Sequence, residues 1–443
     1  MEQYQAIIIG FGKAGKTLAA TLAKEGWKVA IVEQSSSMYG GTCINIGCIP
    51  TKTLVHGAHQ KHGFAAAMER KSSVVEFLRE KNYVNLAQSE NVDIIDGRAE
   101  FIDNTSVRVY QDDGVIELKG NKIFINTGAQ SVVPDIDGIT TTPGVYDSTG
   151  LLNLTTQPEH LGILGGGYIG VEFASIFANF GSKVTIYEAA PLFLPREDRD
   201  VADAIAALLR DDGVNIILNA QVQALSSREG RVLIHTPEGV DDVDALLVAS
   251  GRKPATEQLQ LQNAGVDVDS RGGIIVNKYL RTSADNIWAM GDVTGGLQFT
   301  YISLDDFRIV RDSLLGEGKR TTDDRQNVPY SVFMTPPLSR VGMTEEQARA
   351  SGLNIKVATL PVAAIPRARV IDDTRGVLKA VVDADSQRIL GVSLLCPDSH
   401  EMVNIVKTAM DAGLPYTALR DQIFTHPTMS ESLNDLFAGF ICP

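Results

Sequence analysis

Two stretches of the chain repeat one order of apolar and polar positions. Residues 6–33 and residues 161–188 each read as an apolar run, a G-x-G-x-x-G turn, and a segment with apolar residues at i, i+3 and i+4. Each segment stops at a glycine, and a second apolar run then ends in glutamate. The pattern predicts two copies of a strand, helix and strand unit, and therefore an α/β fold built on an internal repeat.

Other apolar runs extend this organisation. Three of them run into glycine, at residues 122–130, 245–254 and 286–296, and the first two are expected to return the chain beneath a nucleotide. Near the C-terminus, residues 376–396 read as a hairpin and residues 399–413 as a helix. The pattern thus predicts two nucleotide-binding regions followed by a C-terminal region of a different kind.

Length and charge narrow the class of protein. The 443 residues exceed one ordinary core and suggest two or three domains. A net charge of −14, with no run rich in Lys and Arg, argues against nucleic acid and acidic lipid as partners. The longest apolar runs are strand-sized and no cationic leader begins the chain, so we expect no membrane span and a cytoplasmic location.

The glycines of both turns predict dinucleotide binding. The first glycine permits the tight turn, the second lets backbone N–H groups approach a pyrophosphate, and the third lets helix and strand pack closely. The diphosphate then lies at the positive end of the helix, and a glutamate 23 positions after the first glycine accepts hydrogen bonds from a ribose. The residues concerned are Gly10, Gly12, Gly15 and Glu33 in the first copy, and Gly165, Gly167, Gly170 and Glu188 in the second.

The repeat strengthens this interpretation. A single turn of this kind would be weak evidence, since such turns also serve plain packing of a strand on a helix. Two copies with the same spacing favour two dinucleotides. No arginine follows Glu188 until Arg196, so nothing close by in the sequence would hold a 2′-phosphate, and NADH is favoured over NADPH at the second site.

Two of the four cysteines, Cys43 and Cys48, lie five positions apart in the segment GGTCINIGCIPTK. On a regular helix they would be about 140° apart around the axis, so a disulfide requires a distortion, which Gly47 could supply. Structural zinc would need four ligands, and the other two cysteines are remote in sequence. Zinc and two inert buried thiols stay open as alternatives, but redox chemistry is the favoured interpretation.

Several polar residues are ambiguous by themselves. Asp292 follows the run at 286–296, where it could bond a sugar hydroxyl or only stabilise a turn. Lys52 by itself reads as part of a solvated helix face. Glu172 lies in the apolar stretch GVEFASIFA, where an unpaired carboxylate would be costly, so it is expected to pair with Lys52.

The segment around His426 combines two signals. His426 precedes Pro427, which disfavours helix, so a helix is predicted to begin at Thr428 and to present His426 at its entrance. Thr428 and Glu431 also fit a capping box. We interpret His426 as functional, and Glu431 either as its partner or as a cap.

Three motifs resemble the class I pyridine nucleotide-disulfide oxidoreductases, which include dihydrolipoamide dehydrogenase, glutathione reductase and mercuric reductase. The segment GGTCINIGCIPTK is similar to the redox-active disulfide of that family, AMGDVTGG to its second flavin motif, and HPTMSE to its C-terminal histidine-glutamate motif. The resemblance runs from Tyr4 to about Phe437. It implies a glutathione reductase-like fold of two Rossmann-like domains and a C-terminal α+β dimerisation domain.

The resemblance also implies domain boundaries and cofactors. Residues 1–150 would bind FAD, with 281–325 returning to that domain, while 151–280 would bind NADH and 326–443 would form a homodimer. The expected FAD contacts come from the first glycine triplet with Glu33, and from Gly41, Thr42, Lys52, Gly128 and Asp292. The expected NAD contacts come from the second triplet with Glu188, and from Gly251.

The same resemblance assigns catalytic roles. Cys48 would be the thiolate that faces the flavin, and Cys43 the interchange thiol presented to the acceptor. His426 of the other subunit would be the acid/base partner of Cys43, oriented by Glu431, and Lys52 with Glu172 would lie near the flavin. A helix N-terminus and a positive histidine are both expected to lower the pKa of the thiols.

Three longer segments, SVFMTPPLSRVGMTEEQA, PVAAIPRARV and DQIFTHPTMSESLNDLF, are similar to a branch of the family associated with hypochlorous acid defence and NADH-driven Cu(II) reduction. This implies a metal ion, Cu(II) or Hg(II), or an oxidised thiol as acceptor, with Cys43 and Cys48 as transient metal ligands. Cys442, alone near the C-terminus, is interpreted as an idle exposed thiol in preference to a lone metal contact, and Cys396 as part of the core. A dihydrolipoamide dehydrogenase and a non-catalytic thiol redox sensor stay open as alternatives.

Overall fold

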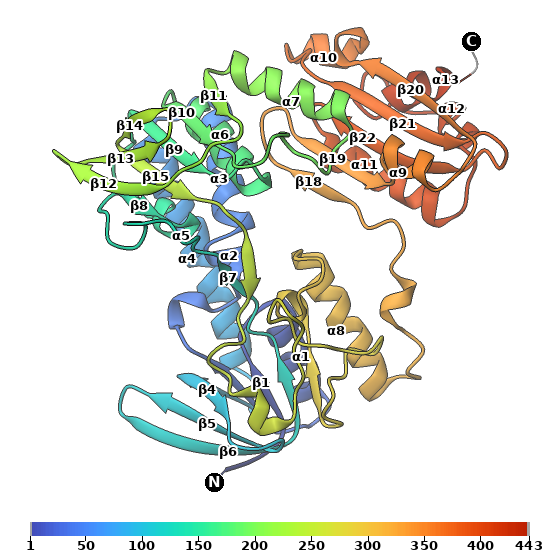
Figure 1. The fold of residues 1–443 in the computed structure, drawn as a ribbon. Coiled ribbons are helices and arrows are strands. Elements are labelled where there is room, and N and C mark those ends of the chain that lie inside the picture. Colours follow the sequence, from blue (N-terminus) through green and yellow to red (C-terminus); the bar gives the residue numbers. More distant parts are fainter. Residues whose placement is uncertain (1, 441–443) are drawn as a thin grey trace. The chain divides into compact units, whose positions relative to one another are not determined.

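The computed structural model describes residues 2–440 and divides them into two compact units (Figure 1). The first comprises residues up to 53, 66–132 and 251–325, and the second comprises 54–65, 133–250 and the residues from 326 onward. Among the described residues, no helix has the length and apolar character that crossing a membrane requires.

The first unit contains a seven-stranded sheet in the order β3-β2-β1-β6-β5-β4, with β17 on β6. Strands β1, β2, β3, β6 and β17 pair in parallel, whereas β4 and β5 continue the sheet antiparallel. The strands are β1 (Glu2–Ile9), β2 (Val29–Glu33), β3 (Val92–Asp96), β4 (Arg98–Phe101), β5 (Ser106–Gln111), β6 (Gly114–Ile125) and β17 (Ile287–Ala289). A two-stranded sheet joins β7 (Ala129–Ser131) to β16 (Arg252–Pro254).

Helix α1 (Lys13–Lys24) covers this sheet with the apolar stripe that the period-3.6 pattern predicts. Its Leu18 and Leu22 are fully buried and join a core with Phe307 and Val310 of α8 (Thr300–Leu315). The helices α2 (Thr42–Asn45), α3 (Cys48–His59) and α4 (Phe64–Ala87) follow β2 in the chain.

The second unit contains a five-stranded parallel sheet in the order β11-β10-β9-β15-β8. Its strands are β8 (Val145–Tyr146), β9 (His160–Leu164), β10 (Lys183–Tyr187), β11 (Val214–Ile217) and β15 (Ala245–Val248). An antiparallel sheet of β12 (Ala224–Arg228), β13 (Arg231–Thr236) and β14 (Gly239–Val243) belongs to the same region, as do the helices α5 (Ser148–Leu151), α6 (Tyr168–Asn179) and α7 (Arg199–Asp211). The two predicted strand, helix and strand copies are therefore confirmed as β1-α1-β2 and β9-α6-β10.

The C-terminal part of the second unit is an antiparallel sheet in the order β18-β19-β22-β21-β20. The predicted hairpin and the predicted helix are confirmed as β21 with β22 and as α11. The elements are β18 (Tyr330–Val332), β19 (Leu338–Gly342), β20 (Ile355–Pro361), β21 (Val377–Asp383), β22 (Ile389–Leu395), α9 (Glu345–Ala350), α10 (Pro366–Val370), α11 (Ser399–Asp411), α12 (Thr417–Arg420) and α13 (Ser432–Ala438). Cys396 is fully buried in this core, as predicted.

Candidate active site

The two cysteines lie on separate helices, and not on one distorted turn. Cys43 is in the four-residue helix α2, and Cys48 is the first residue of α3. Gly47 makes this arrangement possible, because a Cβ there would lie 3.0 Å from the Thr42 carbonyl oxygen and 3.4 Å from the Cα of Cys43. The side chains of the two cysteines hydrogen-bond to one another as thiols.

The hydrogen-bonded thiol pair affects the pKa of Cys43. The hydrogen bond with Cys48, and then burial, raise the pKa of Cys43 above its usual range, although Thr300 and Lys16 act in the opposite direction. The lowering expected from a helix N-terminus and from a histidine of the other subunit stays a prediction, and the contacts within one chain act against it. The pKa rises because the neutral thiol of Cys43 keeps its hydrogen bond with the second sulfur, and because burial leaves a thiolate poorly solvated.

The start of α8 contacts the cysteine pair, which no sequence motif indicated. The hydroxyl of Thr300 lies 3.7 Å from the Sγ of Cys48, across 252 residues of sequence. The next residue, Tyr301, interacts electrostatically with the same thiol. Burial, followed by the charge of Cys48, raises the pKa of its phenol above the usual range. Thr300 is thus positioned to hydrogen-bond the sulfur predicted to face the flavin.

The loop that carries Cys43 is fastened to two helices. Gly41, with φ +82°, packs so closely on α1 that a Cβ there would lie 2.8 Å from the Cα of Gly12. Asn45 donates to the carbonyl of Gly41 at 3.0 Å and accepts from Nε of Arg79 of α4 at 2.8 Å. The predicted FAD contacts Gly41 and Thr42 therefore lie beside the first glycine-rich turn.

Lys16 is buried on α1 and donates to the Oδ1 of Asn82 of α4. No sequence motif indicated this residue. Burial is the main reason why its pKa falls to about 8, while the nearby Cys43 acts to raise it. The positive charge of Lys16 therefore interacts with the thiol of Cys43.

The first glycine turn has the geometry that its spacing predicts. A Cβ at Gly10 would lie 2.3 Å from the carbonyl oxygen of Asn126, and one at Gly15 would lie 2.4 Å from that of Gly10. The side chain of Asn126 accepts from the N–H of Gly15 at 2.9 Å and donates to the carbonyl of Met290 at 2.7 Å. Asn126 therefore joins the turn to the segment after β17, a role that no sequence motif indicated.

Glu33 orders the same turn. Its carboxylate accepts from the N–H of Phe11 at 3.0 Å and from that of Ser35 at 3.2 Å, and burial raises its pKa. The carboxylate thus has protein donors, and its predicted contact with a ribose stays a prediction.

The second glycine turn repeats these contacts. A Cβ at Gly165 would lie 2.6 Å from the carbonyl oxygen of Ala249, and one at Gly170 would lie 2.1 Å from that of Gly165. Glu188 accepts from the N–H of Gly166 at 2.6 Å and from that of Ala190 at 2.7 Å. The two halves of the repeat therefore match in geometry as well as in sequence.

Both turns suit a dinucleotide diphosphate. Within the described residues, neither α1 nor α6 has a side-chain cap on its N-cap glycine or an acidic residue in its first turn. A Cβ on Gly167 would meet no atom within 4 Å, which leaves open space at the start of α6. Ser303 and Asn126 accept from two first-turn N–H groups of α1, but no carboxylate among the described residues neutralises the positive end of either helix. The positive end of a helix favours a diphosphate, so the residues present fit FAD and a nicotinamide dinucleotide.

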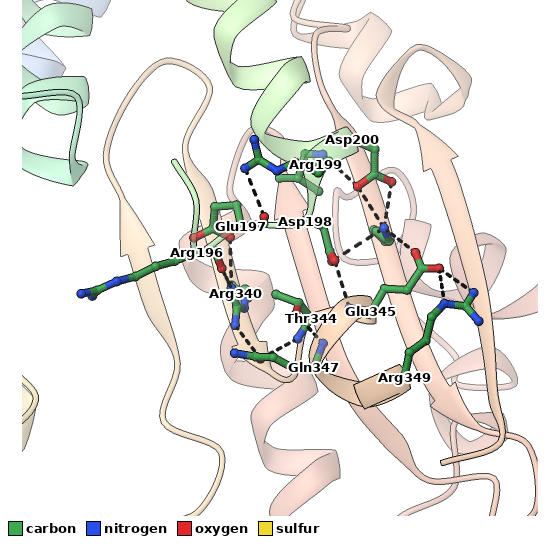
Figure 2. A network of polar contacts seen from close by, with 12 residues as sticks. Arg196, Glu197, Asp198, Arg199, Asp200, Arg340, Thr344, Glu345, Gln347 and Arg349 are labelled. Carbon is green, nitrogen blue, oxygen red and sulfur yellow. Dashed lines mark hydrogen bonds and ion pairs between the residues drawn. The ribbon is translucent and has the colours of Figure 1, made fainter. Parts of the chain in front are cut away.

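A buried polar network holds the start of α6, and Figure 2 shows its central pair, Glu197 with Arg340. The hydroxyl of Tyr168 donates to Oε1 of Glu197 at 2.6 Å, and Tyr330 of β18 donates to the same oxygen. Glu197 has no exposed side-chain surface and pairs with Arg340 of β19 at 3.3 Å. Burial, followed by the charge of Glu197, raises the pKa of Tyr168 to about 12. An ion pair therefore links the second glycine turn to the C-terminal sheet.

A second ion cluster lies next to the first. Lys379 pairs with Glu345 at 2.8 Å, with Asp200 at 2.9 Å and with Asp198 at 3.7 Å. Asp198 also accepts from the N–H of Glu345 at 3.0 Å, where α9 begins, as Figure 2 shows. This cluster stabilises the start of α7 against the C-terminal sheet.

The remaining predicted cofactor contacts lie at strand ends. Gly128, with φ +73°, follows β6, and Gly251, with φ +116°, follows β15; a Cβ on either would meet open space. Asp292 lies in the 3-10 turn after β17, where burial raises its pKa and Arg252 opposes that rise. Their contacts with cofactors stay predictions.

The predicted Lys52–Glu172 pair stays a prediction as well. The amine of Lys52 donates to the hydroxyl of Thr51 at 3.2 Å, and Glu172 accepts from the N–H of Phe333 at 2.8 Å. Lys52 is on α3, as expected from its position after the cysteines.

His426 and Glu431 do meet. Nδ1 of His426 lies 2.8 Å from Oε2 of Glu431, and the histidine side chain is 65% exposed. The helix, however, begins at Ser432, so the predicted start at Thr428 is wrong. The hydroxyl of Thr428 instead accepts from the N–H of Glu431 in a turn at 3.2 Å, and the carboxylate of Glu431 bonds the histidine and does not cap a helix.

Within residues 2–440, no group of three or more His, Cys, Asp or Glu side chains is arranged to hold a metal ion. Transient metal binding by Cys43 and Cys48 stays a prediction. Cys442, interpreted as an idle thiol, lies outside the described residues.

Comparison with known families gives two matches. Residues 4–306 match the model described as pyridine nucleotide-disulphide oxidoreductase, and residues 328–437 match the dimerisation domain of that family. Together they cover both units. They agree with the α/β fold class predicted above, with two Rossmann-like sheets and a C-terminal α+β domain.

Individual relatives are similar over nearly the whole chain. The chain is 73% identical to the probable pyridine nucleotide-disulfide oxidoreductase RclA of Escherichia coli (strain K12), covering 99% of each protein. It is 34% identical to a mercuric reductase of Staphylococcus aureus, covering 97% of this chain and 81% of that protein. Two solved structures match with TM-scores of 0.98 and 73% identity over 99% of both chains: Cu(II) complexes of the HOCl-induced flavoprotein disulfide reductase RclA from Escherichia coli and of its C43S mutant.

Proposed function

The chain belongs to the pyridine nucleotide-disulphide oxidoreductase family, and from this premise we propose that it is an NADH-dependent reductase of Cu(II) in defence against reactive chlorine. Hg(II) and oxidised thiols are further acceptors in this proposal. Family membership makes the chain a flavoprotein oxidoreductase that uses FAD and a nicotinamide dinucleotide, with a dimerisation domain at its C-terminus. The observation that carries the proposal is the hydrogen-bonded pair of cysteine thiols beside the first glycine turn.

The domain roles follow the sheets. We assign FAD to the region of 1–150 with 281–325, NADH to 151–280, and the homodimer to 326–443. The return of β17 to the first sheet supports the first assignment. NADH is favoured over NADPH because the Glu188 carboxylate is fixed by two backbone N–H groups where a 2′-phosphate would be repelled.

When bound, FAD would pass the electron pair of a hydride from the nicotinamide dinucleotide to the Cys43–Cys48 disulfide. The two thiols then reduce two Cu(II) ions to Cu(I), with release of two protons and formation of the disulfide between them. Thiolates suit soft metal ions, which favours Cu(II) and Hg(II) over hard cations at this pair. Thr300 holds the sulfur of Cys48, and Gly47 allows both sulfurs to approach.

His426 is assigned the proton transfer at Cys43 of the partner subunit. Its imidazole is exposed and held by Glu431, which fixes one ring nitrogen and leaves the other available. We assign Lys52 and Glu172 to a pair near the flavin, on the family resemblance.

The test is anaerobic NADH oxidation by the FAD-loaded protein with Cu(II), Hg(II), lipoamide or glutathione disulfide. Cu(II) turnover should exceed lipoamide turnover, and Cys43→Ser or Cys48→Ser should lower it by at least about a hundredfold. Cys442→Ser is the matched control and should turn over normally. Turnover must be measured and not binding, because the relative forms a Cu(II) complex as its C43S mutant.

Other outcomes would replace the proposal. Full Cu(II) turnover by Cys43→Ser would contradict it. Dominant lipoamide turnover would instead favour a dihydrolipoamide dehydrogenase, and negligible turnover of every acceptor would favour a redox sensor.

A further inference from the structure

Lys16 is a buried cation with an unusual partner. Its residue is 8% exposed, and its amine donates to the amide oxygen of Asn82, a neutral acceptor. Within the described residues, no carboxylate is among the groups that shift its pKa, and the nearby Lys13 adds a like charge. A buried ammonium without a countercharge is destabilising, so a packing role does not account for it.

The internal repeat shows that the fold does not require this charge. Lys16 follows the third glycine of the first turn, and the residue that follows the third glycine of the second turn is Val171. Val171 is fully buried in α6, which has the same turn and the same kind of flanking strands. The fold of this unit therefore accepts a buried apolar side chain at this position of the helix.

The location of Lys16 is next to the interchange cysteine. Gly41 packs on Gly12, and a Cβ on the adjacent Gly40 would lie 3.6 Å from Cγ of Asn82, the partner of Lys16. Lys16 and Cys43 are close enough for their charges to interact. The helix that begins at the first glycine turn thus places a positive charge behind the loop that carries Cys43.

We propose that Lys16 makes the acceptor site at Cys43 selective for negatively charged acceptors. This inference rests on the proposed function, in which Cys43 is the sulfur presented to the acceptor. It implies that Cu(II) reaches the thiols as an anionic chelate and not as the hydrated dication. A fixed positive charge that interacts with a partly buried site favours an anion over a neutral acceptor by about tenfold or more.

Disulfide acceptors of different charge test the effect of Lys16 on acceptor selectivity without a metal ion. The Cys43 thiolate attacks one sulfur of the acceptor, the acceptor S–S bond breaks, and one thiolate leaves. Cys48 then attacks the mixed disulfide, which releases the second thiolate and forms the Cys43–Cys48 disulfide. NADH supplies the two electrons that restore the thiols.

The experiment measures kcat/KM of the FAD-loaded enzyme near neutral pH and at low salt, with dithionitrobenzoate, a dianion, and with neutral dithiodipyridine. Lys16→Met should lower kcat/KM for the dianion by about tenfold and change that for the neutral disulfide less than about twofold. Lys16→Arg should retain the preference. Lys24→Met removes an exposed cation from the same helix and should have no effect.

A second variant tests whether misfolding accounts for the loss of activity. Lys16→Val introduces the residue of the second copy, and its FAD content and thermal midpoint should match those of Lys16→Met. With Cu(II) as acceptor, either variant should lose more rate with the anionic nitrilotriacetate chelate than with the cationic diethylenetriamine chelate.

An equal loss with both disulfides, or no loss with either, would overturn the inference while leaving the proposed function intact. If the wild-type protein reduces neither disulfide nor Cu(II), or if Cys43→Ser reduces them normally, the proposed function fails and the inference fails with it.

Discussion

The two glycine-rich turns share a backbone geometry and differ in what supports it. Each turn is ordered by a glutamate, and the first turn is supported further by neutral groups, since Asn126 bonds the N–H of Gly15 and Ser303 bonds that of Ala14. In the second, Tyr168 at the start of α6 depends on the buried ion pair of Glu197 with Arg340.

The difference shows which features of a nucleotide-binding turn are free to vary. The close approaches at the glycines are the same in both copies because backbone sterics fix them. The supporting side chains depend on what each helix packs against. A neutral support is less sensitive to loss of a partner than a buried ion pair, because an unpaired buried charge is far more costly than an unpaired amide.

The largest effect should come from breaking the ion pair. Arg340→Met leaves the fully buried Glu197 without its countercharge and should reduce the free energy of unfolding by about 3–5 kcal/mol. Because Tyr168 is held by the same carboxylate, KM for NADH should rise severalfold while the FAD content per chain stays constant. Denaturant unfolding and steady-state kinetics measure the two effects.

Arg349→Met provides the matched control, because its pair with Glu345 is exposed and should contribute less than about 1 kcal/mol. Equal losses of stability in the two arginine variants would show that the buried network is not a special support of the second turn.

A smaller effect is expected at the first turn, where FAD binding should weaken and NADH binding should not. Asn126→Ala leaves the N–H of Gly15 and the carbonyl of Met290 without a partner and should reduce stability by about 2 kcal/mol. FAD content, measured by absorbance after purification, should fall, whereas KM for NADH should change little. Asn179→Ala is the matched control, because the exposed amide of Asn179 donates to Ser175 of its own helix, and it should change neither. A rise in KM for NADH with unchanged FAD content would reverse the assignment of the two turns.

The smallest effect concerns one hydroxyl and depends on pH. Tyr168→Phe removes the hydrogen bond to Glu197 and should reduce the free energy of unfolding by about 1 kcal/mol at neutral pH. The pKa of Tyr168 is raised from 10.0 to about 12 in the folded protein, so the stability from the protonated phenol is complete below about pH 10 and is lost as the pH rises through about 12. The difference between wild type and variant should therefore shrink across that window. A constant difference from neutral to alkaline pH would show that the phenol does not titrate against Glu197.

Much of the candidate site follows from local sequence rules. The glycine spacing predicted both turns, the apolar period predicted α1 and α6, and the cysteine motif identified the loop where two thiols meet. The start of α13 was missed because the hydroxyl of Thr428 makes a turn with Glu431 before the helix begins. Local capping signals do not distinguish these two uses of one threonine.

The sequence alone determined where the backbone must turn and which residues carry the chemistry, because steric limits at glycine and the period of a helix act over a few residues. Only the tertiary structure decided which side chains support them. Lys16 meets Asn82 across 66 positions, Gly15 meets Asn126 across 111, Glu197 meets Arg340 across 143, and Cys48 meets Thr300 across 252. Such pairs depend on strand register and on the packing of whole helices, which no short-range pattern records.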